Sequence, residues 1–304
     1  MAYLHSDREQ FRDAIDLAYE QTGVMVQAIE KDYYVTMLLR LLAQRMPYIV
    51  FKGGTSLSKC HKVIRRFSED IDITIDTLLS QGQKKKIKQA IVESAEELGM
   101  TIENLDETRS RRDYNRYVIA YDSVIPMASD ALKTAVLLET SYTAVSFPTV
   151  LLPVHSYIGD MMEQEAPDAI EEYNLNPFEM KVQGIDRTLA DKVFAVCDYY
   201  LQGKVAKHSR HLYDIYKLLP LVPQDENFKE LVKEVRAVRE QSVICPSALP
   251  EANVPELLEK IIKEKAYKQD YDSLTTQLLE ENVPYDTVIA TLKKVAESSI
   301  FENN

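Results

Sequence analysis

The spacing of apolar and polar residues divides the chain into two parts. Residues 24–45 place apolar side chains at helical intervals and are followed by Pro47, which predicts a long helix that ends there. Short strand-like runs and further helices follow, and from residue 186 onward the pattern is helical throughout. Strands mixed with helices and then helices alone are typical of an α+β domain joined to an all-helical one. We therefore predict an α+β domain over residues 1–185 and a helical domain over 186–304.

Several elements are predicted within each part. An amphipathic helix over residues 83–98 ends at Gly99, because glycine is favoured directly after a helix. Residues 148–162 fit a strand or a helix equally well. The predicted strands cover 48–51, 69–76, 100–104, 117–122, 135–142 and 179–185, and the predicted later helices cover 186–202, 210–219, 226–241, 254–281 and 283–299.

Composition excludes several classes of protein. The chain is 45% hydrophobic and 28% charged, as expected for a folded globular protein. No apolar run is long enough to cross a membrane, and the charged N-terminus lacks an apolar signal core, so we expect a cytoplasmic protein that is not exported. The three cysteines are far apart and form no Cys-x-x-Cys pair, which argues against a disulfide framework and a zinc site.

A net charge of −12 disfavours general binding to nucleic acid, but basic residues gather locally. One group surrounds residues 52–66, and Arg109, Arg111, Arg112 and Arg116 lie in a predicted hairpin loop. These side chains could offset nearby carboxylates and hold the phosphates of a nucleotide or RNA, or they could form a solvated, salt-bridged surface. The run of lysines at 84–86 fits the solvent-exposed start of a helix.

A glycine pair is the first candidate for chemistry. The chain has only 8 glycines, and Gly53 and Gly54 lie side by side between a predicted strand and a helix for which Thr55 or Ser56 is the expected N-cap. Glycine lets the backbone approach a ligand closely, and such a turn points N–H groups at an anion such as phosphate. The Ser56 hydroxyl could contribute as well.

Two aspartates follow on the next predicted strand. Residues two apart share a face of a strand, so Asp70 and Asp72 project together about 7 Å apart while the intervening isoleucines enter the core. Carboxylates held this close repel each other unless a cation lies between them, and hard oxygen ligands suit Mg²⁺. Glu139, on an apolar strand, is the expected third carboxylate, because an ionised side chain there is costly unless it binds a metal or a partner.

Each motif alone has an ordinary structural explanation. An Asp-x-Asp pair can lie on a solvent-facing strand, and a glycine pair can be a simple turn. The order strand, Gly-Gly, helix, Asp-x-Asp strand is more specific, and it predicts that phosphate and metal meet at one nucleoside triphosphate.

At this point the chain resembles the DNA polymerase β-like nucleotidyltransferase superfamily, and within it the AbiEii/AbiGii toxin family. The resemblance rests on "IEKDYYVTMLL" (29–39), "KGGTSLSK" (52–59) and "RFSEDIDI" (66–73). Downstream, "RTLADKVFAV" resembles the family's lysine motif and maps it onto Lys192, while "RHLYDIYKL" resembles its aspartate motif and maps it onto Asp214. The similar region spans roughly residues 28–220.

The resemblance implies a polymerase β-like core, a mixed sheet with flanking helices, followed by an all-helical C-terminal domain. It also implies a nucleotidyltransferase that uses Mg²⁺ or Mn²⁺ and an NTP, and that acts as the abortive-infection toxin of a pair with an antitoxin protein. Some members are thought to modify the tRNA 3′ end. The implied catalytic residues are Asp70, Asp72, Glu139, Lys192 and Asp214, the first three as metal ligands, and the implied nucleotide-binding residues are Lys52, Gly53, Gly54, Thr55, Ser56, Lys59, Arg66 and Ser68.

The residues themselves leave alternatives open. Lys192 could be an ordinary exposed lysine or could bind the triphosphate, and Asp214 could pair with Lys192 or Arg210 or could orient a substrate. His208 and His211 could share a helix face, but no third metal ligand is evident. The acceptor could also be a small molecule or a protein hydroxyl, which the acidic net charge favours. A non-catalytic module that binds nucleotide or antitoxin is the third hypothesis.

Overall fold

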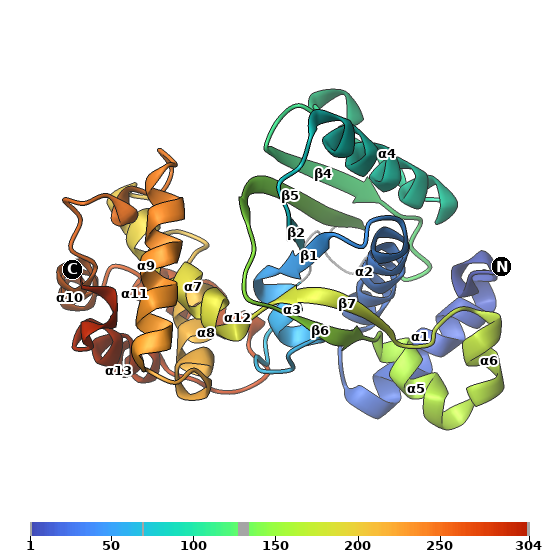
Figure 1. The fold of residues 1–304 in the computed structure, drawn as a ribbon. Coiled ribbons are helices and arrows are strands. Elements are labelled where there is room, and N and C mark those ends of the chain that lie inside the picture. Colours follow the sequence, from blue (N-terminus) through green and yellow to red (C-terminus); the bar gives the residue numbers. More distant parts are fainter. Residues whose placement is uncertain (1, 69, 127–133, 303–304) are drawn as a thin grey trace. The chain divides into compact units, whose positions relative to one another are not determined.

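The computed structural model describes residues 2–68, 70–126 and 134–302. The chain forms two compact units (Figure 1). The first comprises Met1–His61 and Ser68–Gln183, and the second comprises Lys62–Phe67 and Gly184–Asn304. The short segment Lys62–Phe67, which lies between the glycine pair and the two aspartates in the sequence, therefore belongs to the second unit. No local pattern in the sequence indicates this.

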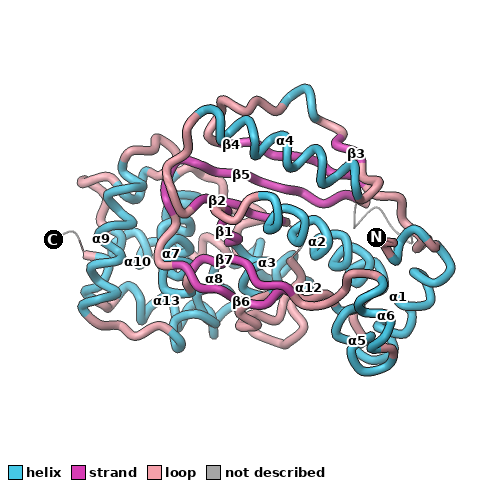
Figure 2. Tube along the Cα trace, turned by 45° about the vertical axis from the view of Figure 1, so that its right-hand side comes forward, coloured by secondary structure: helices cyan, strands magenta, loops and turns pink. Residues whose placement is uncertain are grey.

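A seven-stranded mixed sheet organises the first unit, with the strand order β3-β4-β5-β2-β1-β7-β6 (Figure 2). The pairs β2–β5 and β1–β7 are parallel, and the other neighbours are antiparallel. The strand that follows the glycine pair, β2, lies in the interior of the sheet between β5 and β1. The strands are β1 (Ile49–Lys52), β2 (Ile71–Ile75), β3 (Thr101–Ile102), β4 (Tyr114–Ala120), β5 (Ala135–Val145), β6 (Thr149–Val154) and β7 (Phe178–Gln183).

Helices complete the core of the first unit. The long helix α2 buries most of its residues, and it contacts both β5 and α4. Its apolar side chains share one core with those of α1, α4, α5 and the sheet. The helices of this unit are α1 (Arg8–Thr22), α2 (Val26–Arg45), α3 (Gly53–Lys59), α4 (Gln81–Glu97), α5 (Tyr157–Glu165) and α6 (Pro167–Glu172).

The predicted strands of the first unit are all present, with small differences at their ends. Residues 148–162, which fitted either element, contain both: β6 is followed by α5, and the Ser156 side chain caps α5 by accepting a hydrogen bond from the Gly159 N–H. The expected N-cap at Thr55 or Ser56 was wrong. Helix α3 begins at Gly53 after Lys52, which provides no side-chain cap, and the Ser56 hydroxyl donates instead to the Gly53 carbonyl at 2.9 Å within the first turn.

The second unit is helical. Its main helices are α7 (Ile185–Leu201), α8 (Arg210–Leu218), α9 (Glu226–Glu240), α10 (Val254–Glu264) and α13 (Tyr285–Ala296), with the short segments α11 (Lys268–Asp270), a π-helix (Tyr271–Thr275) and α12 (Thr276–Leu278) between the last two. The single helix predicted over 254–281 was therefore wrong. Lys265 adopts a left-handed conformation, with φ of 52°, and ends α10. The turn buries Tyr267 and Tyr271, whose hydroxyls donate to the carbonyls of Val196 and Val283.

The segment Lys62–Phe67 packs against the residues that follow α12. The Phe67 N–H donates to the Leu278 carbonyl at 2.8 Å, and the Glu280 N–H donates to the Arg65 carbonyl at 3.0 Å. Arg66 and Leu279 form an antiparallel bridge between these two bonds. A short two-stranded contact thus holds this segment in the helical unit. Across the described ranges, no helix combines the length and the apolar composition that a membrane crossing requires.

Candidate active site

Asp72 lies at the start of β2, in the interior of the sheet, and Asp70 directly precedes this strand. Ile71, Ile73 and Ile75 are buried, which leaves Asp70 and Asp72 half-buried on the other face, as the alternation predicts. The Oδ1 atom of Asp70 is buried and has no hydrogen-bond partner among the described residues. A buried carboxylate oxygen without a partner is costly, and a bound cation would remove that cost.

Glu139 is the cross-strand neighbour of Asp72. The two residues pair in the parallel register of β2 and β5, so their side chains emerge on the same face. Burial raises the pKa of the Glu139 carboxyl, and the negative charges of Asp72 and Asp70 raise it further. The Tyr114 hydroxyl and Arg116 oppose this shift, and the Arg116 Nε lies 3.6 Å from Glu139 Oε1. Asp72 and Glu139 are therefore neighbours across the two strands, although 67 positions separate them in the sequence, and Asp70 is close enough to act on Glu139 electrostatically.

The glycine turn lies directly against Asp72. Gly53 has a φ of +80°, a conformation that favours glycine, and a Cβ at this residue would lie 2.0 Å from Asp72 Oδ2. Only glycine therefore allows the backbone to approach the carboxylate this closely. Across the β1–β2 pair, Lys52 is the register partner of Asp72, so its side chain emerges on the carboxylate face too.

The arrangement fits a divalent cation. Three carboxylates gather on one sheet face, one of their oxygens is buried without a hydrogen-bond partner among the described residues, and Glu139 has a raised pKa. Oxygen donors of this kind are the ligands that Mg²⁺ and Mn²⁺ prefer.

The hydroxyl residues of the predicted site support the turn. Ser56 is fully buried and donates to the Gly53 carbonyl, so it holds the turn closed. The hydroxyls of Thr55 and Ser68 lie 2.9 Å apart, which links α3 to the residues that lead into β2. Gly54 is buried within α3.

Lys59 is paired with a residue of α2. Its ammonium lies 2.6 Å from Asp32 Oδ1 and 2.7 Å from the Thr36 hydroxyl, and its side chain is only 5% exposed. Asp32 and Thr36 belong to α2, so this buried pair attaches α3 to the long helix. Sequence reasoning did not single out Asp32, because the pair joins helices that are separated along the chain.

Arg66, Lys192 and Asp214 meet inside the second unit. The Arg66 guanidinium binds Asp214 through two hydrogen bonds of 2.7 and 2.9 Å, and the Lys192 ammonium lies 2.9 Å from Asp214 Oδ2. All three side chains are buried. Of the partners considered for Asp214, Lys192 is therefore confirmed, and Arg66 is a partner that the sequence did not indicate.

Burial and charge oppose each other in this cluster. Burial opposes the ionisation of Asp214, but Arg66 and Lys192 together hold its pKa well below the usual value. Burial also lowers the pKa of the Lys192 ammonium, while Asp214 works against that shift. The His211 Nδ1 lies 3.1 Å from the Lys192 ammonium, and burial together with Lys192 lowers the pKa of His211 to about 3. His211 is therefore neutral, and the cluster is a carboxylate held between two cations.

Comparison with known proteins identifies the family of the chain. A profile of the nucleotidyl transferase AbiEii toxins of type IV toxin–antitoxin systems matches residues 36–291. The chain belongs to the AbiEii nucleotidyl transferase toxin family. The AbiEii match includes the three carboxylates, Lys192 and Asp214, and it extends through most of the helical unit.

Among solved structures, the chain is similar to MenT4, a nucleotidyltransferase toxin from Mycobacterium tuberculosis. The similarity has a TM-score of 0.51 at 16% identity, and it covers 93% of this chain and 88% of MenT4. No curated protein matches the sequence. The predicted α+β fold and the predicted nucleotidyltransferase class are therefore confirmed for this AbiEii family member.

Proposed function

We propose that the protein transfers a nucleoside monophosphate from an NTP to an acceptor hydroxyl at the face of β2 and β5, with the help of a divalent metal. The observation that carries this proposal is the contact between the two sequence motifs. The Gly53 turn lies against Asp72, and Asp72 is paired with Glu139.

In this proposal Asp70, Asp72 and Glu139 hold Mg²⁺ or Mn²⁺, which neutralises charge on the triphosphate when it is bound. The backbone around Gly53 and Gly54 cradles the phosphates, and Lys52 adds a positive charge on the carboxylate face. Glu139, beside Asp72 on the same sheet face, is the carboxylate proposed to accept the proton of the acceptor hydroxyl. The acceptor oxygen then attacks the α-phosphorus, and pyrophosphate leaves.

The roles proposed for Lys192 and Asp214 follow from their contacts. Asp214 holds Lys192 and Arg66 at the same time, so it positions both cations. Removing Asp214 would release the segment that contains Arg66, which precedes Asp70 by only four residues.

Family membership supports a biological role as the toxin of a type IV pair with a separate antitoxin protein. The proposed acceptor is the 3′ end of a tRNA, and a small-molecule or protein hydroxyl is the competing acceptor, favoured by the net charge of −12. Co-expression with the product of a neighbouring reading frame tests the partner. We expect this product to relieve growth arrest that the protein causes and that an Asp70→Asn/Asp72→Asn variant does not cause.

Incubation of the purified protein with labelled NTPs, Mg²⁺ or Mn²⁺ and total RNA tests the reaction. We expect label to move to an RNA with the wild-type protein but not with Asp70→Asn. Asp16→Asn is the matched control, because Asp16 is exposed on α1. If no NTP labels any RNA, small-molecule or protein acceptor, or if Asp70→Asn labels as well as wild type, the proposed reaction is wrong.

A further inference from the structure

A group of basic side chains lies at one end of the first unit. Residues 84–88 and 106–116 contain eight basic and three acidic residues, a net charge of +5 in a chain of −12, so the rest of the chain carries −17. We call this group the basic ridge. Its basic members are Lys84, Lys85, Lys86 and Lys88 at the start of α4, and Arg109, Arg111, Arg112 and Arg116 in the loop before β4 and at its start.

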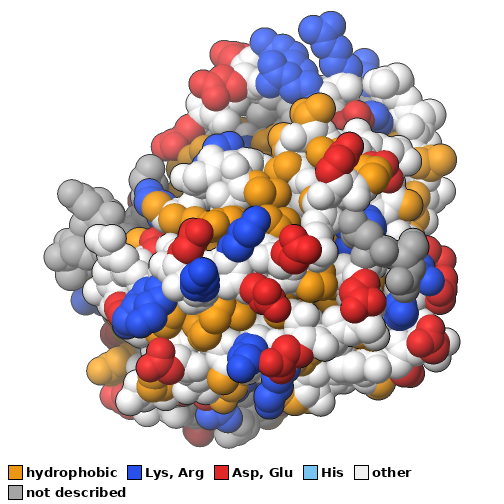
Figure 3. Space-filling model, turned by 90° about the vertical axis from the view of Figure 1, so that its left-hand side faces the viewer, with side chains coloured by type: hydrophobic (Ala, Val, Ile, Leu, Met, Phe, Trp, Pro, Cys, Tyr) orange, Lys and Arg blue, Asp and Glu red, His pale blue; other side chains and the backbone are white. Residues whose placement is uncertain are grey.

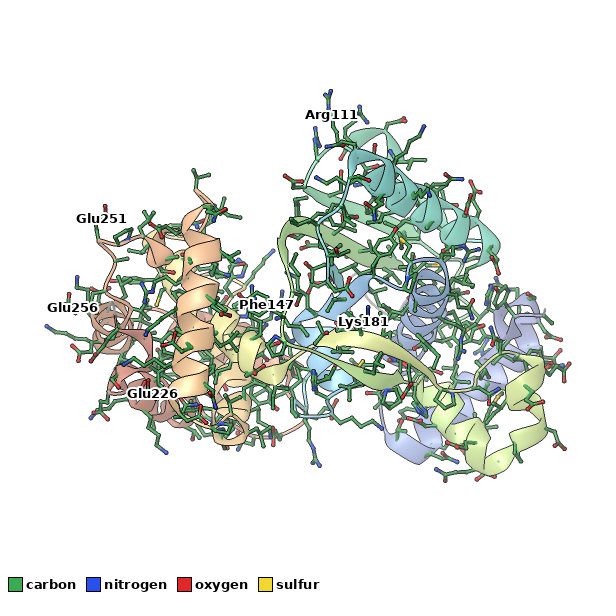
Figure 4. All side chains as sticks on the ribbon, viewed as in Figure 1. Arg111, Phe147, Lys181, Glu226, Glu251 and Glu256 are labelled. Atoms are coloured by element: carbon green, nitrogen blue, oxygen red, sulfur yellow. The ribbon has the colours of Figure 1, made fainter. Side chains whose placement is uncertain are left out.

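Direct contacts join the two segments into one surface. The Lys84 ammonium lies 2.5 Å from Asp113 Oδ1, and the Lys88 ammonium donates to the Thr108 carbonyl at 2.9 Å. Lysines and arginines gather at the top of the space-filling view (Figure 3), and Arg111 points outward from the end of the unit that carries α4 and β4 (Figure 4).

Most of this positive charge is not neutralised. Lys85, Lys86 and Arg111 are exposed, and none of them has a carboxylate partner among the described residues. The guanidiniums of Arg109 and Arg112 donate to backbone carbonyls of their own loop. These bonds order the side chains but do not neutralise their positive charge. A solvated surface with interspersed charges would place acidic partners beside each cation, whereas among the described residues of the ridge Asp113 pairs with Lys84 and Glu139 pairs with Arg116.

Strand β4 leads from the ridge to the carboxylates. Tyr114 follows the loop directly and pairs with Ser141, and Arg116 pairs with Glu139, which in turn pairs with Asp72. Residues paired in this way emerge on the same sheet face, as do residues two apart on one strand. The half-exposed Tyr114 therefore emerges on the face that carries the carboxylates, between the exposed arginines of the loop and Arg116 along the chain, and its hydroxyl interacts with Glu139.

We propose that the basic ridge binds the phosphodiester backbone of a single-stranded acceptor end of RNA, whose terminal base stacks on Tyr114. This inference rests on the proposed function, because it assigns the surface that holds the acceptor proposed for the same site. Arg112 precedes Arg116 by four residues, up to roughly 13 Å of extended chain, and the lysines of α4 extend the surface further. Successive phosphates of a strand suit such a surface, and an aromatic ring accepts any base by stacking.

Binding without NTP tests the ridge apart from the chemistry. The affinity of a fluorescent single-stranded RNA is measured by anisotropy at several KCl concentrations, from low to well above physiological salt. We compare wild type with Lys85→Ala/Arg111→Ala and with the control Lys260→Ala/Lys294→Ala, which removes the same charge from exposed positions in the second unit. We expect the ridge variant to lose about tenfold in affinity and the slope of log K against log salt to fall by about 1.4, at about 0.7 per phosphate contact. The control should match wild type.

A second pair of variants tests the stacking. We expect Tyr114→Phe to bind the RNA as wild type does and Tyr114→Ala to lose about tenfold, because only the ring is needed. Equal binding by the ridge variant and wild type overturns the proposal, as does binding to vesicles of phosphatidylglycerol without binding to RNA. RNA binding without nucleotidyl transfer would refute the proposed reaction but not the ridge, and transfer to a small acceptor without RNA binding would refute only the ridge.

Discussion

Gly53 and Asp72 are in contact, although 18 residues separate a glycine turn from a strand carboxylate: a Cβ at residue 53 would lie 2.0 Å from Asp72 Oδ2. No β-carbon can occupy that space unless the carboxylate moves. The backbone proposed to hold phosphate and the side chain proposed to hold metal are therefore held at a fixed separation. The proposed site can therefore be tested by replacing Gly53, a substitution that adds a methyl group and removes no functional group.

Gly53→Ala should inactivate the protein. The added methyl group displaces Asp72, and the positive φ adds strain of roughly 1–2 kcal/mol. Gly99→Ala is the matched control, because Gly99 also has a positive φ, of +65°, but a Cβ at residue 99 would meet nothing within 4 Å. We expect both variants to lose similar backbone stability by denaturant unfolding, while only Gly53→Ala loses nucleotidyl transfer, by about 100-fold or more. Equal activity of the two variants would show that Asp72 need not stay in place.

Divalent metal should stabilise the protein through Asp70. A ligand that binds only the folded state raises the unfolding temperature. The Oδ1 atom of Asp70 has no hydrogen-bond partner among the described residues, so a bound cation would stabilise this buried oxygen. We expect Mn²⁺ or Mg²⁺ to raise the melting temperature of wild type and of Asp16→Asn, but not of Asp70→Asn. In calorimetric titration, an Asp70→Asn variant that binds Mn²⁺ as tightly as wild type does would exclude Asp70 as a ligand.

Glu139 should make stability depend on pH in the absence of metal. Its folded pKa is raised above the unfolded value of 4.5, so the folded protein holds this proton longer. Stability is then lost as pH rises from about 4.5 through the folded pKa. Because Gln resembles the protonated form, Glu139→Gln should be more stable than wild type at mildly alkaline pH and no more stable below the unfolded pKa, measured by urea unfolding with chelator present. Glu103→Gln, at an exposed position, should show no such difference.

The same group predicts the pH dependence of activity. Because Glu139 must be ionised to bind metal, the metal concentration needed for half-maximal activity should rise as pH decreases through its raised pKa. Glu139→Gln should be inactive at every pH, although it folds. An active Glu139→Gln variant with an unchanged pH profile would assign the ionisation to another residue.

Asp214→Asn should destabilise the second unit strongly. It leaves the buried cations Arg66 and Lys192 without their shared carboxylate, a change that typically costs about 3–5 kcal/mol. Because the folded pKa of Asp214 is depressed, its contribution is present above the unfolded value of 3.8 and is lost as pH falls toward the folded pKa. Urea unfolding at neutral pH measures the effect, and Glu230→Gln, which removes an exposed ion pair with Lys233, should change little.

A charge-conserving variant separates the role of the pair from the role of its charge. Arg66→Lys keeps the positive charge but loses the bidentate hydrogen bonding to the Asp214 carboxylate, so we expect an intermediate loss of stability. If Arg66→Lys and Asp214→Asn are both as stable as wild type, the cluster does not hold the segment in place.

The sequence by itself determined the features that depend on near neighbours. The period of two along residues 70–75 placed Asp70 and Asp72 on one face and three isoleucines in the core, because alternation is a property of any strand. The change of pattern after the last strand separated the mixed sheet from the helices. The motif order around Gly53 indicated the class of enzyme, which family membership confirmed.

Only the tertiary structure decided which distant residues meet. The register of β2 and β5 brought Glu139 beside Asp72, whereas Lys59 and Arg66, expected at the nucleotide, pair with Asp32 and Asp214. An isolated basic residue in a sequence does not indicate its partner, because the free energy of a buried charge depends on carboxylates that the fold supplies from elsewhere. Local periodicity likewise did not indicate the break after α10, where Lys265 is left-handed and Tyr267 and Tyr271 are buried, because their partners Val196 and Val283 lie outside that helix.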